Sequence, residues 1–213
     1  MLSTAHERLH RDLQSFIPAA RLISDPLRTL AYGTDASLYR LIPQLVVRVE
    51  SEQEMQRILA LAHQYRTPVT FRAAGTSLSG QAVTDSVLLQ LGDGWRHWHL
   101  GEEAATITLQ PSIIGGHANR YLLPYRRKIG PDPASINTCQ IGGIAANNAS
   151  GMCCGTAQNS YQTLKSMRVM LADGTVLDTG NRASREAFRA SHSALLDRLA
   201  ELGRSTRTDA ALA

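Results

Sequence analysis

Small residues and hydroxyl side chains gather at two places in this chain, and both places are suited to holding a ligand with backbone N–H groups. The first stretch, residues 72–81, reads Arg-Ala-Ala-Gly-Thr-Ser-Leu-Ser-Gly-Gln and follows a β-branched run. Such a turn exposes N–H donors without a bulky Cβ in the way, which is what phosphate binding requires. The stretch holds neither a Walker A sequence nor a G-x-G-x-x-G sequence, so taken alone an ordinary Gly/Ser turn explains it equally well.

The second stretch, residues 131–155, raises the weight of the first. It opens with Pro131-Asp132-Pro133, whose two fixed φ angles and missing donors predict a rigid loop. Gly142-Gly143 then allows a sharp turn or the close approach of a ligand, and no charged residue lies between Ser135 and Thr163. Residues this small make a poor core by themselves. The stretch therefore predicts a backbone cradle for a bulky cofactor.

Other residues with reactive side chains form no comparable pattern. Cys153 and Cys154 are adjacent, a poor spacing for two ligands of one zinc ion, and no Cys or His partners lie nearby in sequence. A strained vicinal disulfide is an alternative, but we favour small residues of a packed loop, with Cys139 buried in the same way. His117 falls on an expected helix, where packing or surface exposure is the common role. We therefore predict no metal site and assign no catalytic residue.

The composition bounds the function classes. The chain has 213 residues, of which 43% are hydrophobic, enough for one or two compact domains. The net charge of +4 is scattered, and the basic triplet 126–128 is interpreted as a solvated loop, which disfavours nucleic-acid binding. No apolar run approaches the roughly 20 residues of a membrane helix, and no signal peptide opens the chain. With no disulfide framework, a cytoplasmic protein is expected.

A β-α-β unit positions the first stretch. Residues 45–49 and 69–72 are β-branched runs that predict strands. Between them, Ser51 and Glu54 form a capping box, in which Ser51 accepts from the third helical N–H and Glu54 reaches back. A helix is expected to follow with Met55, Ile58 and Leu59 on its buried face. Residues 87–91 predict a third strand.

The remaining elements are expected on both sides of this unit. Residues 1–30 predict a short amphipathic helix and an irregular segment, with apolar positions at Leu9, Leu13, Phe16 and Ile17, and residues 31–43 predict a loop. Residues 95–100 and 106–110 predict an antiparallel pair, and Pro111-Ser112 opens a helix. Asp173-Gly174 predicts a hairpin turn, and a helical pattern from Ser184 ends at the C-cap candidate Gly203. The polar tail 204–213 predicts no further element, as if the chain were cut rather than finished.

The order of these motifs resembles one family. A strand, Arg-Ala-Ala-Gly-Thr-Ser-Leu-Ser-Gly, Gly-Pro-Asp-Pro-Ala-Ser and Ile-Gly-Gly-Ile-Ala-Ala-Asn-Asn-Ala-Ser-Gly are similar to the FAD-binding domain of the vanillyl-alcohol oxidase / p-cresol methylhydroxylase superfamily. Residues 151–161 resemble the long FAD-dependent D-lactate dehydrogenases that carry an iron–sulfur region. The resemblance covers roughly residues 25–200. It implies an α+β, PCMH-type fold with two α/β subdomains and FAD between them.

The resemblance also implies domain bounds and roles for matching residues. Residues 1–30 would be a helical lead-in, 31–95 the first FAD-binding subdomain and 96–213 a truncated second one. Ala73 and Ala74 stand where many members have glycine, and alanine fits there only if φ stays negative. Ser112 also stands where many members have glycine. The cofactor-contacting positions implied by the resemblance are Ala73, Ala74, Gly75, Thr76, Ser77, Gly80, Gln81, Pro131, Asp132, Pro133, Ser135, Gly142, Gly143, Asn147, Asn148, Ser150 and Gly151.

The implied function is that of a flavin-dependent D-2-hydroxy-acid dehydrogenase, with D-lactate the favoured substrate and hydride transfer from its α-carbon to flavin N5. The alternatives are glycolate or D-2-hydroxyglutarate dehydrogenases, or a non-catalytic module that keeps the fold. The substrate-binding and catalytic groups, and the ligands of a 4Fe-4S cluster, would lie beyond residue 213, so this fragment alone is expected to be inactive. A quinone or cytochrome would accept the electrons, with peripheral association to the inner face of a membrane an alternative to a purely cytoplasmic location.

Overall fold

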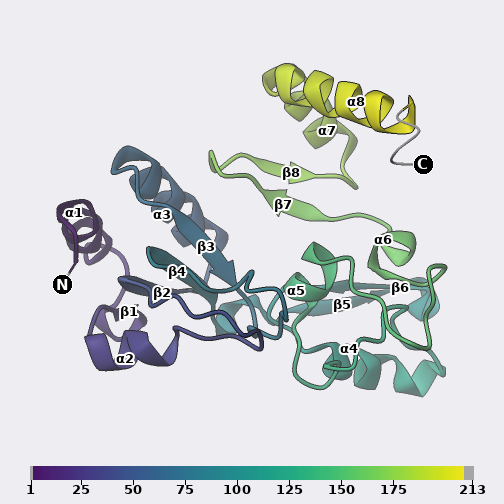
Figure 1. Cartoon of the computed structure of the whole chain (residues 1–213). Helices are drawn as coiled ribbons and strands as arrows, with labels where there is room; N and C mark the ends of the chain where they lie inside the picture. The colour runs from purple at the N-terminus through teal and green to yellow at the C-terminus, as the bar shows by residue number, and fades with distance from the viewer. Residues whose placement is uncertain (1, 209–213) are drawn as a thin grey trace. The chain divides into compact units, whose positions relative to one another are not determined.

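Helices and strands alternate through the chain, which divides into two compact units (Figure 1). The structure, a computed structural model, describes residues 2–208. The first unit runs to Leu164 and the second begins at Lys165. The expected α+β class is confirmed. The expected bounds at residues 30 and 95 stay predictions.

A four-stranded sheet forms the centre of the first unit. Its order is β1 (Leu22–Ile23), β2 (Leu45–Val49), β4 (Val87–Leu91) and β3 (Val69–Arg72). Strands β2 and β3 both run parallel to β4, whereas β1 is antiparallel to β2. The predicted β-α-β unit is therefore present, with β4 lying between its two strands. Apart from Arg48 and Gln90, strands β2 and β4 are apolar, as expected where both faces of a sheet are covered.

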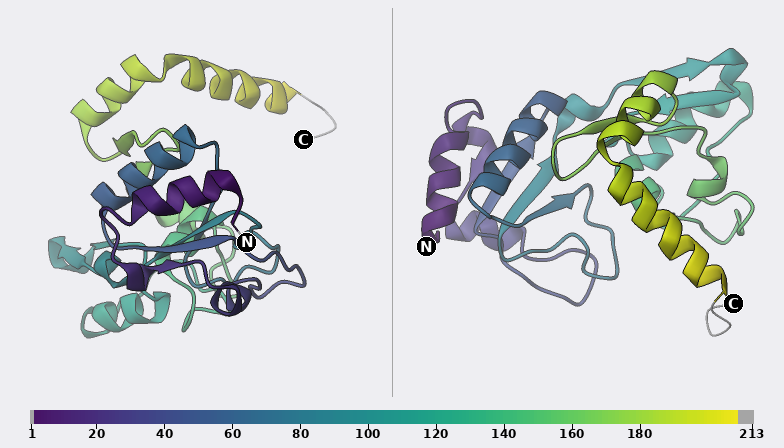
Figure 2. Two further views of the ribbon diagram at one scale, coloured as in Figure 1. Left: turned by 90° about the vertical axis from the view of Figure 1, so that its left-hand side faces the viewer. Right: turned by 90° about the horizontal axis from the view of Figure 1, so that it is seen from above.

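Helices cover the two faces of this sheet (Figure 2). On one side lie α1 (Thr4–Leu13) and α3 (Glu52–Gln64), which bury the residues Leu9, Leu13, Met55, Ile58, Leu59 and Ala62. On the other lies α2 (Pro26–Ala31), followed by Tyr32, which packs on the cluster of Ile23, Val46 and Leu88. The sequence predicted the first helix but not β1, η1 (Ala19–Arg21) or α2, because elements this short show no period.

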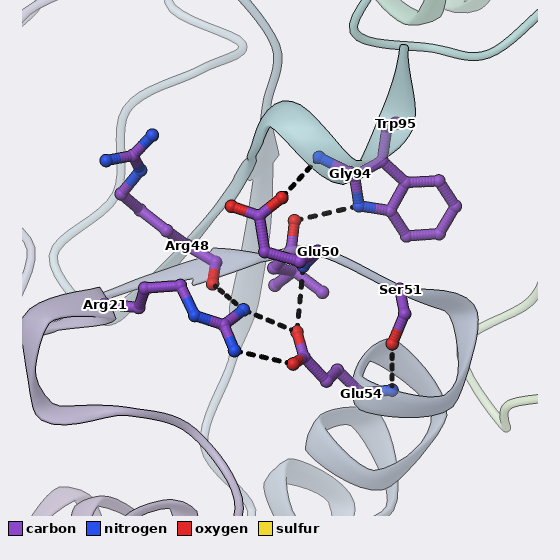
Figure 3. Close-up of polar contacts among 8 residues, drawn as sticks. Arg21, Arg48, Glu50, Ser51, Glu54, Gly94 and Trp95 are labelled. Carbon is purple, nitrogen blue, oxygen red and sulfur yellow. Dashed lines mark hydrogen bonds and ion pairs between the residues drawn. The ribbon is translucent and has the colours of Figure 1, made fainter. Parts of the chain in front are cut away.

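The junction of β2 and α3 is held by a polar network (Figure 3). Ser51 accepts from the Glu54 N–H at 3.2 Å, as the capping box predicted. The Glu54 carboxylate instead accepts the N–H of Glu50 at 2.8 Å and binds Arg21 at 2.7 Å. The Glu50 carboxylate in turn accepts the N–H of Gly94. These contacts fix the carboxyl ends of β2 and β4 relative to each other.

The rest of the first unit contains the second small-residue stretch, residues 131–155, and the elements around it. The expected antiparallel pair is confirmed, but the helix predicted to open at Pro111-Ser112 begins three residues later. The N–H of Gly115, which would donate to the Pro111 carbonyl in such a helix, donates instead to the Cys139 carbonyl at 3.0 Å, and Ile114 is extended. The elements are η2 (Asp93–Trp95), β5 (Trp98–Gly101), η3 (Glu102–Ala104), β6 (Thr106–Leu109), α4 (Gly115–Leu122), η4 (Leu123–Tyr125), α5 (Ile141–Ala146) and α6 (Ser160–Thr163).

The second unit is a hairpin followed by two helices: β7 (Arg168–Met170), β8 (Val176–Asp178), α7 (Arg182–Ser191) and α8 (Ser193–Thr208). The hairpin at Asp173-Gly174 is confirmed. The helical pattern predicted from Ser184 is confirmed, and it is divided at His192 into α7 and α8. The C-cap at Gly203 is wrong: α8 continues to Thr208, since one glycine costs only about 1 kcal/mol among good helix formers. Residues 209–213 of the expected tail lie outside the described residues.

Candidate cofactor-binding site

The first stretch is a loop that leaves the carboxyl end of β3, the edge where parallel sheets bind ligands. Within residues 2–208, the N–H groups of Ala74, Gly75, Thr76 and Ser77 donate to no protein acceptor. Gly75 has a φ of +70°, a conformation that glycine adopts without strain. The loop therefore offers a run of unused donors suited to an anionic group.

The rest of this loop is held by its own side chains. The Ser77 hydroxyl lies 2.9 Å from Gln81 Oε1 and accepts the N–H of Ser79 at 3.2 Å. Gly80 has a φ of +69°, and a Cβ there would meet the ring of Tyr39 at 2.6 Å. These contacts keep the loop compact while the donors at 74–77 stay available.

The proline-rich part of the second stretch packs against the end of the same stretch. The N–H of Asp132 donates to the Ser150 carbonyl at 3.0 Å. A Cβ at Gly151, which has a φ of +153°, would overlap the carbonyl of Asp132. The Ser135 carbonyl accepts the N–H groups of two following residues, Thr138 and Cys139. Asp132, Pro133, Ser150 and Gly151 therefore form one rigid corner.

Gly142 and Gly143, where a sharp turn or the close approach of a ligand was expected, lie in the short helix α5. Gly142 packs directly on Pro111, where a Cβ would approach to 2.9 Å. Gly143 differs: a Cβ would meet only the Cβ of Ala73, at 3.8 Å, and within residues 2–208 its N–H has no acceptor. The two stretches, far apart in sequence, thus meet at Ala73 and Gly143.

The two asparagines after α5 are used by the fold. Asn147 is the C-cap and donates its N–H to the Gly143 carbonyl at 3.1 Å. Asn148 has a φ of +46°, and its side-chain oxygen accepts the N–H of Tyr161 at 3.0 Å. Both residues therefore hold the end of α5, and a cofactor contact from either would come in addition to that role.

The three cysteines differ in solvent exposure. All three thiols are free; Cys139 and Cys154 are buried and Cys153 is exposed. Burial raises the pKa of the Cys139 thiol. The interpretation as packed loop residues therefore holds for Cys154 and not for Cys153. Across residues 2–208, no group of three or more His, Cys, Asp or Glu side chains is arranged to hold a metal ion.

Sequence reasoning missed one segment that contacts the first loop. Residues 31–43 were expected to be a bland loop, yet the N–H of Ala36 donates to the Gly75 carbonyl at 3.0 Å. Arg72, the last residue of β3, donates to the carbonyl of Thr34 at 2.8 Å. The sequence gives little indication of this contact, because every residue type has a backbone carbonyl. Asp35 and Ser37, which favour tight turns, were the only residues that indicated an ordered segment.

Comparisons with known proteins agree with this geometry. The family described as "FAD binding domain" matches residues 43–180. The chain belongs to that family. Its unused N–H donors at residues 74–77 and the open approach at Gly143 fit a bulky cofactor with an anionic diphosphate, so the residues present are compatible with FAD. No helix among residues 2–208 is long and apolar enough to cross a membrane.

Similar proteins support the expected superfamily. Glycolate oxidase subunit GlcD of Escherichia coli strain K12 is 30% identical over 80% of this chain and 35% of that protein. D-2-hydroxyglutarate dehydrogenase of the same strain is 27% identical over 70% of the chain and 15% of its own length. A probable mitochondrial D-lactate dehydrogenase of Danio rerio is 29% identical over 72% and 31%. The chain thus spans at most 35% of each of these relatives.

Solved structures confirm the fold. Alkyldihydroxyacetonephosphate synthase aligns with a TM-score of 0.69 and 21% identity, over 84% of this chain and 37% of that one. p-Cresol methylhydroxylase also gives a TM-score of 0.69, with 13% identity over 84% of this chain and 36% of that one. The PCMH-type FAD-binding fold implied by the sequence motifs is therefore confirmed.

Proposed function

We propose that this chain is the FAD-binding part of a flavin-dependent D-2-hydroxy-acid dehydrogenase, with D-lactate the favoured substrate. The observation that carries the cofactor assignment is the meeting of two donor-bearing stretches at Ala73 and Gly143, with unused N–H groups on both. The substrate class is supported by the three relatives, whose names refer to glycolate, D-2-hydroxyglutarate and D-lactate. Bound FAD would supply a flavin ring able to accept a hydride.

This chain's own residues bind and orient the cofactor. The N–H groups of residues 74–77 would hold the diphosphate, because donors that are already aimed need no rearrangement when the anion arrives. Pro131 and Asp132 would border the flavin and ribityl chain from the rigid corner described above, and Gly143 would let the cofactor approach the backbone. We assign six further predicted contacts to the same cofactor: Gly80, Gln81, Ser135, Asn147, Asn148 and Ser150.

The finer parts of the proposal concern the longer parent protein. A 2-hydroxy-acid site, a 4Fe-4S cluster and transfer to a quinone or cytochrome would depend on residues beyond this chain. The parent is proposed to be cytoplasmic, with peripheral association to the inner face of the membrane as the alternative. We also propose the bounds 1–30, 31–95 and 96–213 for the lead-in and the two FAD-binding subdomains, and we expect no dehydrogenase activity from this chain by itself.

Purification of the full-length parent tests the cofactor and substrate together. We expect a flavin absorbance spectrum in the purified protein and reduction of an artificial electron acceptor with D-lactate, and less or none with glycolate, D-2-hydroxyglutarate or L-lactate. L-lactate is the stereochemical control. Absence of flavin from an intact parent would end the cofactor assignment. Flavin with faster turnover of glycolate or D-2-hydroxyglutarate would keep the class and correct the substrate.

A further inference from the structure

We infer that Arg72 positions the first cofactor loop and adds positive charge beside it, held in place by the loop-facing segment 32–39. This inference rests on the proposed FAD-binding role of that loop. The Arg72 guanidinium donates to the carbonyls of Tyr32 at 3.1 Å and Thr34 at 2.8 Å. A Cβ at Gly75 would lie 2.6 Å from Arg72 Nη2. The cation is therefore packed directly against the backbone that carries the unused donors.

Further contacts tie the segment 32–39 to both ends of the loop. The N–H of Ala36 donates to the Gly75 carbonyl at 3.0 Å, near the start of the loop. The Asp35 carboxylate accepts the N–H groups of Ser37 at 2.8 Å and Ala82 at 3.4 Å, just past the loop's end. The segment therefore contacts the loop on both sides, and Arg72 joins the segment to β3.

The segment is itself closed, which makes it a stable partner. A bridge joins Thr34 to Arg40, and the N–H of Leu41 donates to the Gly33 carbonyl at 3.1 Å. Because its two ends are joined, docking it on the cofactor loop orders little additional chain. The segment can therefore hold the loop before the cofactor arrives.

The charges agree with this role. Burial lowers the pKa of Arg72, with Asp35 opposing, yet an arginine stays protonated. Burial raises the pKa of Asp35, but hydrogen bonds from Ser37 and Ala82 and the charge of Arg72 outweigh it, so its pKa is lowered overall. Asp35 keeps its negative charge and offsets part of the field of Arg72, so the direct packing of the Arg72 guanidinium against Gly75 is what favours an incoming diphosphate at this loop.

The test compares Arg72→Gln, Arg72→Lys and a matched control, Arg28→Gln, in the full-length protein. Arg28 is an exposed arginine of α2. Without FAD, we expect faster hydrogen exchange at the Ala36 and Ala82 amides in Arg72→Gln and wild-type exchange in the control. The dissociation constant for FAD, from flavin fluorescence, should rise about tenfold for Arg72→Gln and about threefold for Arg72→Lys. If Arg72→Gln does not fold, Asp35→Asn should still speed exchange at Ala82.

The outcomes separate the two proposals. Wild-type exchange at Ala36 and Ala82 together with unchanged FAD affinity in Arg72→Gln would overturn the positioning role and leave the cofactor assignment intact. Equal weakening by Arg28→Gln would overturn it too, because charge alone, without contact to the loop, would then explain the effect. A wild-type protein that never binds FAD would overturn both.

Discussion

Gly142 and Gly143 are neighbours in sequence, yet the space available for a side chain differs between them. A Cβ at Gly142 would lie 2.9 Å from the Cβ of Pro111, whereas one at Gly143 would meet only Ala73 at 3.8 Å. The first glycine therefore serves packing, and the second leaves an open approach between the two stretches. This difference gives a test within one dipeptide.

We expect Gly142→Ala to lower the free energy of unfolding by about 1–3 kcal/mol, because overpacking shifts the backbone. Gly143→Ala should change it by less than about 0.5 kcal/mol. Gly143→Leu should fold but bind FAD at least about tenfold more weakly, since its side chain would fill the approach. Urea unfolding and a flavin titration measure the two effects. Equal destabilisation by both alanines would contradict this interpretation of the dipeptide.

Ser112 carries a hydroxyl that the fold does not use. The residue is 1% exposed, and among residues 2–208 its Oγ has no hydrogen-bond partner. A buried polar group without a partner costs about 1–3 kcal/mol. Ser112→Ala should therefore raise the free energy of unfolding by about 1 kcal/mol in urea denaturation. The exposed Ser79, changed to alanine, should have almost no effect, and a loss of stability in Ser112→Ala would show that the hydroxyl has a partner in solution.

At the scale of elements, one buried histidine docks α1 on the sheet. His6 is 6% exposed, and its ring nitrogens lie 2.6 Å from the Ser3 hydroxyl and 2.8 Å from the Ser86 hydroxyl. Burial lowers the pKa of His6 below 6.5, with Asp85 opposing. The unfolded chain therefore binds this proton more readily. The stability that depends on neutral His6 is complete above about pH 6.5 and is lost as the pH falls below it.

We expect urea unfolding at about pH 5.5 to show a lower free energy of unfolding than at pH 7.5, with His6→Gln losing less between the two values than the wild type. His99→Gln, at an exposed position in β5, is the control and should lose as much as the wild type. The docking role fails if His6→Gln and His99→Gln respond to pH in the same way.

Two glycines in the second unit test backbone conformation without a steric complication. A Cβ at Gly203 or at Gly174 would meet nothing within 4 Å, but Gly174 has a φ of +83° and Gly203 lies inside α8. Gly203→Ala should raise the helix's stability by about 0.5–1 kcal/mol, and Gly174→Ala should lower the hairpin's by about 1–2 kcal/mol. Thermal unfolding followed by circular dichroism measures both; shifts of the same sign would contradict the explanation.

The elements that sequence could predict are those whose pattern depends on local chemistry. Strands β2, β3 and β4 are β-branched or apolar runs, and the α3 cap follows from Ser51. The position of β4 between β2 and β3 could not be predicted from the sequence, because strand order depends on how α3 crosses the sheet. The site shows the same difference. Glycine-rich loops can be recognised from the sequence, whereas the backbone carbonyls of Tyr32 and Thr34 that bind Arg72 cannot, because any residue type has a carbonyl.

At the scale of the whole molecule, the apolar core is unequally shared. Of the buried hydrophobic side chains in residues 2–208, all lie in the first unit except Phe188. Three of the four leucines of α8, at 195, 199 and 202, are exposed by 41%, 54% and 61%. Hydrophobic burial is the main favourable term in folding, and a segment with one buried side chain cannot offset its chain entropy.

The two units should therefore differ when separated. We expect a fragment of residues 1–164 to unfold in urea with one sharp transition, since it keeps the sheet and the helices that cover both its faces. A fragment of residues 165–213 should show weak helicity that declines gradually with denaturant, because its described part, residues 165–208, completes no core. Far-ultraviolet circular dichroism measures both, with the intact chain as the reference. A sharp transition in the shorter fragment would mean that the α8 leucines find a partner within these 49 residues or in a second copy of them.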